Sequence, residues 1–278
     1  MVVMDMKWLT GMLLVWMLAR TELAMQAASE ACRLFVTSVM PGLLPYMALM
    51  QWLISRTGGR LPALAVTAMG WGGGSPTGAL LLQSARDADG RTARRIAVSC
   101  QTMSPMFLAG TLGGWLRSPV AGWCILAGVI AGGCVTGCLA VRGSMTMLTV
   151  SHDPIRLGDA IERTMRTMLL ICGTMAVMRM AAAMAYDVLH SYPLLALAVT
   201  TLLEVTTGAN VIAALPCPLA LRTALLAAAT AFGGASVVLQ NHALLPEGLL
   251  SLPAQVMWQA VHAALSFLIA LGLALLVL

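Results

Sequence analysis

Two short motifs interrupt hydrophobic segments of this chain with residues that can bind a ligand. Residues 72–79 read Gly-Gly-Gly-Ser-Pro-Thr-Gly-Ala, and residues 204–210 read Glu-Val-Thr-Thr-Gly-Ala-Asn. The two motifs share Thr-Gly-Ala at an offset of 130 residues. Paired interruptions in the two halves of a membrane protein indicate a transporter-like binding site near the bilayer midplane.

Both motifs supply hydrogen-bonding groups in places where a helix must break. Glycine permits unusual dihedrals and close approach of the backbone, and serine and threonine offer hydroxyl groups. The new half-helix that follows each break carries a partial positive charge at its start, which suits an anionic or strongly polar ligand group. The alternative is that these small residues only allow tight helix packing. The candidate ligand-binding residues are Gly74, Ser75, Thr77, Gly78, Gln101, Ser104, Glu204, Thr206, Thr207, Gly208 and Asn210.

Glu204 is the most unusual of these residues, because it is ionisable and lies among Leu202, Leu203 and Val205. A carboxylate inside a membrane segment is a functional hypothesis by default. It would bind a coupling H⁺ or Na⁺, or hold a hydroxyl or amine of the ligand. The alternative is a structural ion pair with Arg179, which also falls within an expected helix. Both readings hold if the pair forms in one state and opens in another.

Composition places the chain among helical membrane proteins. Hydrophobic residues make up 59% of the 278 residues, charged residues only 10%, and the mean hydropathy is +0.87. Charged residues make up about a quarter of a typical soluble domain, far more than in this chain. We therefore expect the fold class of an all-α polytopic membrane protein. A β-barrel is disfavoured, since long stretches such as 252–278 are almost wholly apolar rather than alternating. The formal net charge of +5 comes from residues at the ends of apolar segments, so no nucleic-acid partner is expected.

The sequence carries no pattern for catalysis or for a metal. Seven cysteines occur without a Cys-x-x-Cys or Cys/His cluster, and the glycine run lacks the Lys-Ser/Thr of a phosphate-binding loop. Residues 73–77 also fail the Gly-x-Ser-x-Gly nucleophile pattern. We therefore expect no enzyme, no catalytic residue, no metal site and no cofactor.

The order of elements predicts a duplicated architecture. We expect an N-terminal helix at 1–20, a repeat A at 21–141, a cytoplasmic linker at 142–158 and a repeat B at 159–278. Repeat A comprises an interfacial amphipathic helix (21–34), a spanning helix (35–54), a broken segment (61–84) and helices at 93–116 and 120–141. Repeat B comprises an amphipathic stretch (159–166) running into a helix that ends near 186, a broken segment (192–215) and helices at 219–240 and 252–278. Gln101 and Ser104, in the helix after the first broken segment, are expected to face the broken tips.

The distribution of basic residues favours broken segments that turn back within the membrane. With re-entrant segments and the N-terminus inside, each half has three crossings and the halves form an inverted repeat. Eleven basic residues are then cytoplasmic and four lie outside, in agreement with the positive-inside rule. The cytoplasmic set is Lys7, Arg56, Arg60, Arg86, Arg91, Arg94, Arg95, Arg142, Arg156, Arg163 and Arg166, and the outer set is Arg20, Arg33, Arg117 and Arg222.

Five short motifs, in order, resemble the landmarks of the sporulation integral membrane protein YlbJ family. They lie at 41–46, 74–79, 104–111, 203–208 and 232–240, and the resemblance covers roughly residues 20 to 270. That family is similar to the nucleoside-recognition, or Gate, superfamily. The resemblance implies a multi-pass protein of the bacterial cytoplasmic membrane in a spore-forming lineage, with a gated-pore architecture. One departure is Ser75, where family members often carry an aromatic residue, so no aromatic contact to a ligand is expected there.

Two functional classes follow from these observations. The first is an integral membrane transporter or gated channel-like protein for a small polar or anionic solute, linked to sporulation. Its partners are the solute, the lipid bilayer, a coupling H⁺ or Na⁺ and a second copy of the chain. The second is a non-transporting membrane scaffold or assembly factor for spore formation on a transporter-like fold. Polar residues at both breaks and the buried carboxylate favour the first class.

Overall fold

The computed structural model describes residues 2–57, 59–85, 89–143, 145–150 and 154–278. Helices dominate these ranges, and five of them are long and apolar enough to cross a membrane. They are Thr21–Arg56, Pro119–Ala140, Leu157–Leu189, Leu219–Leu244 and Leu252–Val277. The chain is therefore an α-helical, multi-pass membrane protein, as its composition predicts. Arg86, one of the basic residues used for the topology, lies outside the described residues.

The elements follow one another along the chain in this order: α1 (Val2–Ala19), α2 (Thr21–Leu34), the π-helical η1 (Phe35–Val39), α3 (Met40–Thr57), β1 (Gly59–Pro62), α4 (Ala63–Gly73), α5 (Thr77–Gln83), α6 (Gly90–Ser99), the π-helical η2 (Met106–Thr111), α7 (Leu112–Trp115), α8 (Pro119–Ala140), β2 (Met147–Val150), α9 (Leu157–Leu189), α10 (Pro193–Leu203), α11 (Val205–Ala213), α12 (Leu219–Phe232), α13 (Gly234–Leu244) and α14 (Leu252–Val277).

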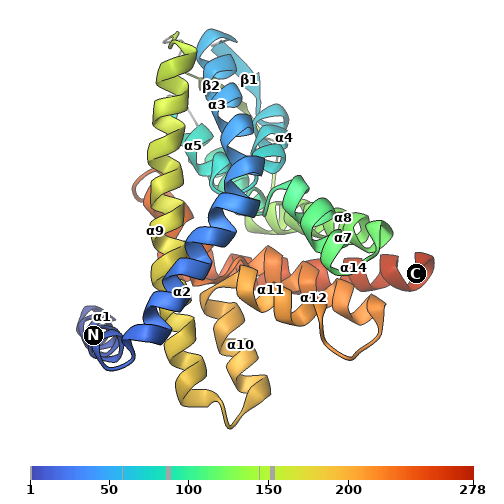
Figure 1. Ribbon diagram of the computed structural model, residues 1–278. Helices are drawn as coiled ribbons and strands as arrows, with labels where there is room; N and C mark the ends of the chain where they lie inside the picture. Colours follow the sequence, from blue (N-terminus) through green and yellow to red (C-terminus); the bar gives the residue numbers. More distant parts are fainter. Residues whose placement is uncertain (1, 58, 86–88, 144, 151–153) are drawn as a thin grey trace.

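Two long helical rods form the spine of the molecule. The 33-residue α9 crosses the rod made by α2, η1 and α3, which together run without a break (Figure 1). The separate interfacial helix expected at 21–34 is instead the first part of this rod. The wider π turn ends just before Pro41, and Met40 N–H donates to Phe35 O. A π turn absorbs the register change that a proline without an N–H imposes, so the helix bends and continues.

Both broken segments form pairs of short helices, as the sequence predicts. The first helix pair is α4 and α5, joined by 74–76, and the second is α10 and α11, joined at Glu204. The pairs lie toward opposite ends of α9 (Figure 1). In each pair, glycine lets the two helices approach each other closely. A Cβ at Gly70 would lie 3.3 Å from Gly78 Cα, and one at Gly208 would lie 2.6 Å from Thr201 Cα. We call the two connections, residues 74–76 and residue 204, the hairpin tips.

The helices that follow the hairpins are also broken, where continuous helices were expected at 93–116 and 219–240. In the first half, α6 ends at Ser99 and regular helix resumes only with η2. In the second half, Gly233 and Gly234 separate α12 from α13 with φ of +81° and +69°. These positive angles suit glycine alone. Hydropathy does not detect the second break, because the residues around Gly233 are largely apolar; the first break lies in the polar stretch from Ser99 to Pro105.

The membrane-embedded core rests on small residues. Helix α8 packs closely on α14, where a Cβ at Gly128 would lie 2.8 Å from the Ala270 Cβ. Such close approach of backbones is the usual way in which membrane helices associate. The expected linker at 142–158 contributes a feature that the sequence did not indicate: β2 pairs antiparallel with β1 in a two-stranded sheet, with Leu61 opposite Leu148. Leu148 is fully buried there, so apolar packing fixes this pairing.

Candidate functional site

The first hairpin tip packs into the break between α6 and η2. The Ser75 N–H donates to Thr102 O, and a Cβ at Gly74 would clash with the backbone nitrogen of Ser104. Only glycine fits at this position, which also has a φ of +67°. The Ser75 hydroxyl donates to Asn241 Oδ1 of α13 at 2.7 Å. The tip of the first half is therefore held by polar contacts to both halves of the chain.

The second tip is organised by the buried Glu204 side chain, which caps the N-terminus of α11. Its carboxylate accepts from Thr206 N–H at 3.0 Å, from Thr207 N–H at 2.8 Å and from the Thr207 hydroxyl at 2.7 Å. The side chain is only 2% exposed. An acidic N-cap satisfies N–H groups that have no helical partner and opposes the positive end of the helix dipole. Glu204 therefore has a structural role in addition to any functional one.

The break in the second half lies directly against this tip. A Cβ at Gly234 would stand 3.1 Å from Thr201 O and 3.2 Å from Val205 N. The start of α13 thus touches the end of α10 and the start of α11. Each hairpin tip consequently meets the break in the next helix of its own half.

A small cavity lies where the two tips approach each other. Its volume is about 40 Å³. Both tips line it, the first through Ser75 and the second through Glu204, and Ser104 and Thr206 lie beside them. Ser236 and Gln240 of α13 and Ser38 of η1 complete the polar lining; the remaining lining is apolar and includes Leu43, Phe107, Ile171 and Met175. We call this space the tip cavity.

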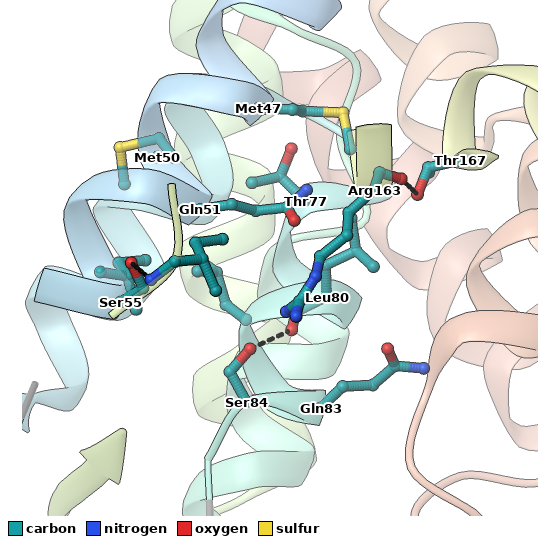
Figure 2. Close-up of a pocket in the computed structure, with 13 residues that line it drawn as sticks. Met47, Met50, Gln51, Ser55, Thr77, Leu80, Gln83, Ser84, Arg163 and Thr167 are labelled. Carbon is teal, nitrogen blue, oxygen red and sulfur yellow. Dashed lines mark hydrogen bonds between the residues drawn. The ribbon is translucent and has the colours of Figure 1, made fainter. Parts of the chain in front are cut away.

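A larger cavity of about 310 Å³ opens between α3, α5 and α9 (Figure 2). Figure 2 shows Arg163 extending from α9 toward the side of α5 that carries Leu80 and Ser84. Thr77, at the start of α5, lies on the same wall and is 3% exposed, and its hydroxyl has no hydrogen-bond partner among the described residues. Other polar residues that line the cavity are Gln51 and Ser55 of α3, Gln83 and Ser84 at the end of α5, and Thr167 of α9. We call this space the Arg163 cavity.

A third cavity, of about 470 Å³, lies on the other side of the tip cavity. It contains Thr207 and Asn210 of α11, and it shares Glu204, Thr206 and Met175 with the tip cavity. Arg179 also lines it and pairs with Glu30 of α2. The ion pair that the sequence suggested between Arg179 and Glu204 is therefore not the pairing in this conformation. We call this space the Arg179 cavity.

The three cavities follow one face of α9. Arg163 and Thr167 line the first, Ile171 and Met175 the second, and Met175 and Arg179 the third. Steps of four residues keep side chains on one side of a helix. Buried Leu43, Met47, Met168, Ile171 and Met175 form one apolar cluster along this face. The arrangement is a polar space at each end with an apolar, narrow middle in which both hairpin tips are exposed to the small tip cavity.

The structure brings together some of the predicted site residues and separates others. Ser75, Ser104, Glu204 and Thr206 meet at the tip cavity, Thr207 and Asn210 lie in the Arg179 cavity, and Thr77 lies in the Arg163 cavity. Gly74, Gly78 and Gly208 serve close packing against Ser104, Cys100 and Thr201. Gln101 lies behind the site, where its Oε1 accepts from Gln255 Nε2 at 3.4 Å.

Some polar residues near the site were not selected from the sequence. Asn241 and Arg163 resemble ordinary helix-end residues, and nothing local distinguishes them. A stronger signal exists on α14, whose Gln255, Gln259, His262 and Ser266 recur at steps of four, three and four and are all nearly fully buried. The His262 Nε2 donates to Val129 O at 2.9 Å, so this polar stripe joins α14 to α8. Helical periodicity of polar residues inside an apolar segment marks that face as buried in protein.

In comparisons with known proteins, no protein-family model, no curated protein and no solved structure matches this chain.

Proposed function

We propose that this chain is a membrane transporter or gated channel-like protein for a small polar or anionic solute. The observation that carries the proposal is that both hairpin tips line one cavity, with Ser75 on one side and Glu204 on the other. Backbone that is not helical at membrane depth is tolerated where protein buries it or where it lines a polar space. Two such tips meeting between two wider polar cavities describe a solute path with a closed centre.

The path that we propose runs along the face of α9 from the Arg163 cavity to the Arg179 cavity. A small solute enters one wide cavity, and the apolar cluster around Met47 and Met175 blocks its passage in the present conformation. Transport requires the two hairpins to move relative to the rods. Separate short helices joined by single breaks allow such motion at a few backbone angles.

We propose that the two halves form an inverted repeat with re-entrant hairpins. Support comes from the order of elements: each half has a rod, a hairpin and a broken helix, followed by a long apolar helix that is α8 or α14. The placement of the hairpins toward opposite ends of α9 agrees with entry from opposite faces (Figure 1). The eleven-to-four distribution of basic residues supports the same orientation.

The resemblance to the YlbJ family extends the proposal to a cellular role. On that basis the protein belongs to the bacterial cytoplasmic membrane and acts in sporulation. The coupling ion, H⁺ or Na⁺, is proposed from the buried carboxylate of Glu204, and the lack of a catalytic motif leads us to expect no enzymatic activity. A second copy of the chain is a further expected partner.

The second candidate function is a membrane scaffold for spore formation. The observation that favours it is the tight closure of the middle: the tip cavity measures only about 40 Å³ and the apolar cluster separates it from the Arg163 cavity. A scaffold needs no path through its centre. The two functions differ in whether purified protein moves a solute.

Reconstitution in liposomes distinguishes the two functions. Stopped-flow light scattering would follow uptake of uridine, gluconate and sorbitol as separate osmotic probes, with protein-free liposomes as the blank. We expect the wild type to pass at least one probe and Glu204→Gln to slow that flux at least tenfold, because the tip loses its charge. Glu247→Gln is the matched control, because it makes the same change at an exposed glutamate that lines none of the three cavities. Failure of all three probes, together with wild-type spore formation by Glu204→Gln in a sporulating host, would favour the scaffold.

A further inference from the structure

We propose that the tip cavity is a binding site for a monovalent cation of the size of Na⁺, held by Glu204 and Ser236. The inference deepens the proposed function, since it names the ion that would share the solute path. It is tested without any solute, so its failure and that of transport can be told apart.

The volume of the tip cavity selects its occupant. A cavity must offer roughly 10–15 Å³ to hold one water molecule, so about 40 Å³ is room for only a few water-sized particles. A metabolite does not fit in this space without movement of the hairpins. A dehydrated ion, alone or with a water molecule or two, fits as the cavity stands.

The polar groups around the tip cavity are oxygen donors suited to a hard cation. Glu204 provides a carboxylate, and Ser75, Ser104, Thr206 and Ser236 provide hydroxyls. Hard cations prefer carboxylate, hydroxyl and carbonyl oxygens. Ser236 points to a ligand directly, because it is 1% exposed and its hydroxyl has no hydrogen-bond partner among the described residues.

Two helix ends come directly before lining residues of the tip cavity along the chain: α10 before Glu204, and α12 a few residues before Ser236. Helix α10 ends at Leu203 and α12 ends at Phe232, and the last carbonyls of a helix have no helical partner. A Cβ at Gly234 would lie 3.1 Å from Thr201 O and 3.4 Å from Leu202 O, so the end of α10 adjoins the start of α13 that carries Ser236. Ends of broken helices are a recurrent way of coordinating coupling ions in transporters.

The charge at Glu204 calls for a cation. Its carboxylate accepts three hydrogen bonds from Thr206 and Thr207, which leaves lone pairs on both oxygens. The basic side chain that shares a cavity with it, Arg179, is engaged with Glu30. Among the described residues, Glu204 is the only acidic side chain on the tip cavity. One negative charge is balanced by one monovalent ion, whereas a divalent ion would leave an excess positive charge beside the N-terminus of α11.

Ion-dependent stability of the purified protein tests the site. The wild type in detergent, dialysed into choline chloride at pH 7.5, is titrated with NaCl, KCl or further choline chloride at equal ionic strength. Because a ligand that binds only the folded state raises the melting temperature, we expect a saturable upward shift that is at least twofold larger in NaCl than in KCl or choline chloride. Glu204→Gln and Ser236→Ala should each abolish the Na⁺-specific shift.

Ser266→Ala is the matched control, because Ser266 is also a buried serine without a hydrogen-bond partner among the described residues but lies on α14, outside the tip cavity. It should keep the full shift. If Glu204→Gln fails to fold, Ser236→Ala still decides. The proposal is overturned if the wild type shows no Na⁺-specific shift or if Ser236→Ala retains it. A shift that follows pH and not Na⁺, and disappears in Glu204→Gln, would assign a proton to the site instead.

Discussion

Ser75 and Asn241 are 166 residues apart in the sequence and are joined by a 2.7 Å hydrogen bond from the Ser75 hydroxyl to Asn241 Oδ1. Both residues are buried, Ser75 at 7% and Asn241 at 3% exposure. The bond connects the tip of the first hairpin to the broken helix of the second half. It is a direct polar contact between the two halves of the chain.

Removing this bond should destabilise the protein measurably. Ser75→Ala leaves the Asn241 carboxamide buried without its donor, and we expect a loss of about 1–3 kcal/mol in the free energy of unfolding. Unfolding in mixed micelles, followed by circular dichroism, measures the loss. Ser84→Ala is the control, since Ser84 is exposed and its hydroxyl only donates back to Leu80 O of its own helix. Equal stability of Ser75→Ala and wild type would contradict the contact.

Gly78 should behave as a packing residue rather than as a cavity residue. A Cβ there would lie 2.5 Å from the Cys100 Cβ, so Gly78→Ala should cost about 1–3 kcal/mol of stability. Cys100→Gly removes the clashing atoms, and the double variant should recover part of the loss in a double-mutant cycle. Gly173→Ala serves as the control, because a Cβ added there would meet no atom within 4 Å and alanine favours a helix. Additive effects of Gly78→Ala and Cys100→Gly would speak against direct contact.

The inverted repeat that we propose predicts labelling of its two halves from opposite sides of the membrane. Single cysteines at Arg91, just inside α6, and at His190, after α9, in a cysteine-free background should react with a membrane-impermeant maleimide from opposite faces. Both positions are exposed in the structure, so accessibility to reagent depends on the side of the membrane alone. Labelling of intact vesicles reports which cysteine is accessible from one face of the membrane, and labelling of inverted vesicles reports which is accessible from the other. Reaction of both cysteines in the same vesicle preparation would rule out the inverted repeat.

The Arg179–Glu30 pair should contribute little to stability. Its side chains are 22% and 62% exposed, so solvent or headgroups screen the attraction and we expect about 0.2–1 kcal/mol for Arg179→Gln. Glu30→Gln should cost a similar amount, and the double variant no more than either. Glu204→Ala should cost more, because it removes an N-cap and leaves N–H groups of α11 buried without an acceptor. Thermal unfolding measures the stability of all four variants. A larger loss of stability for Arg179→Gln than for Glu204→Ala would refute this ranking.

The sequence by itself determined the features that depend on local composition. The apolar excess specified a helical membrane protein, because no soluble core could bury so much hydrophobic surface. The breaks at 74–76 and at Glu204 were also visible, since a glycine-proline run and an acidic N-cap disrupt or begin a helix through their own backbone and side chain. The place of Glu204 within an apolar stretch was likewise evident from Leu202, Leu203 and Val205 beside it.

The tertiary structure decided everything that depends on which distant segments meet. Arg179 could pair with Glu204 or with Glu30 on sequence grounds, and only the packing of α2 along α9 selects Glu30. The break at Gly233 has no hydropathy signal because the residues around it are largely apolar, whereas the break after Ser99 lies in a polar stretch that ends at Pro105 and that a continuous helix could also have carried. The role of a glycine depends on which residue packs against it. Gly78 makes room for Cys100, and its own identity does not show whether it would face a cavity or a neighbouring side chain.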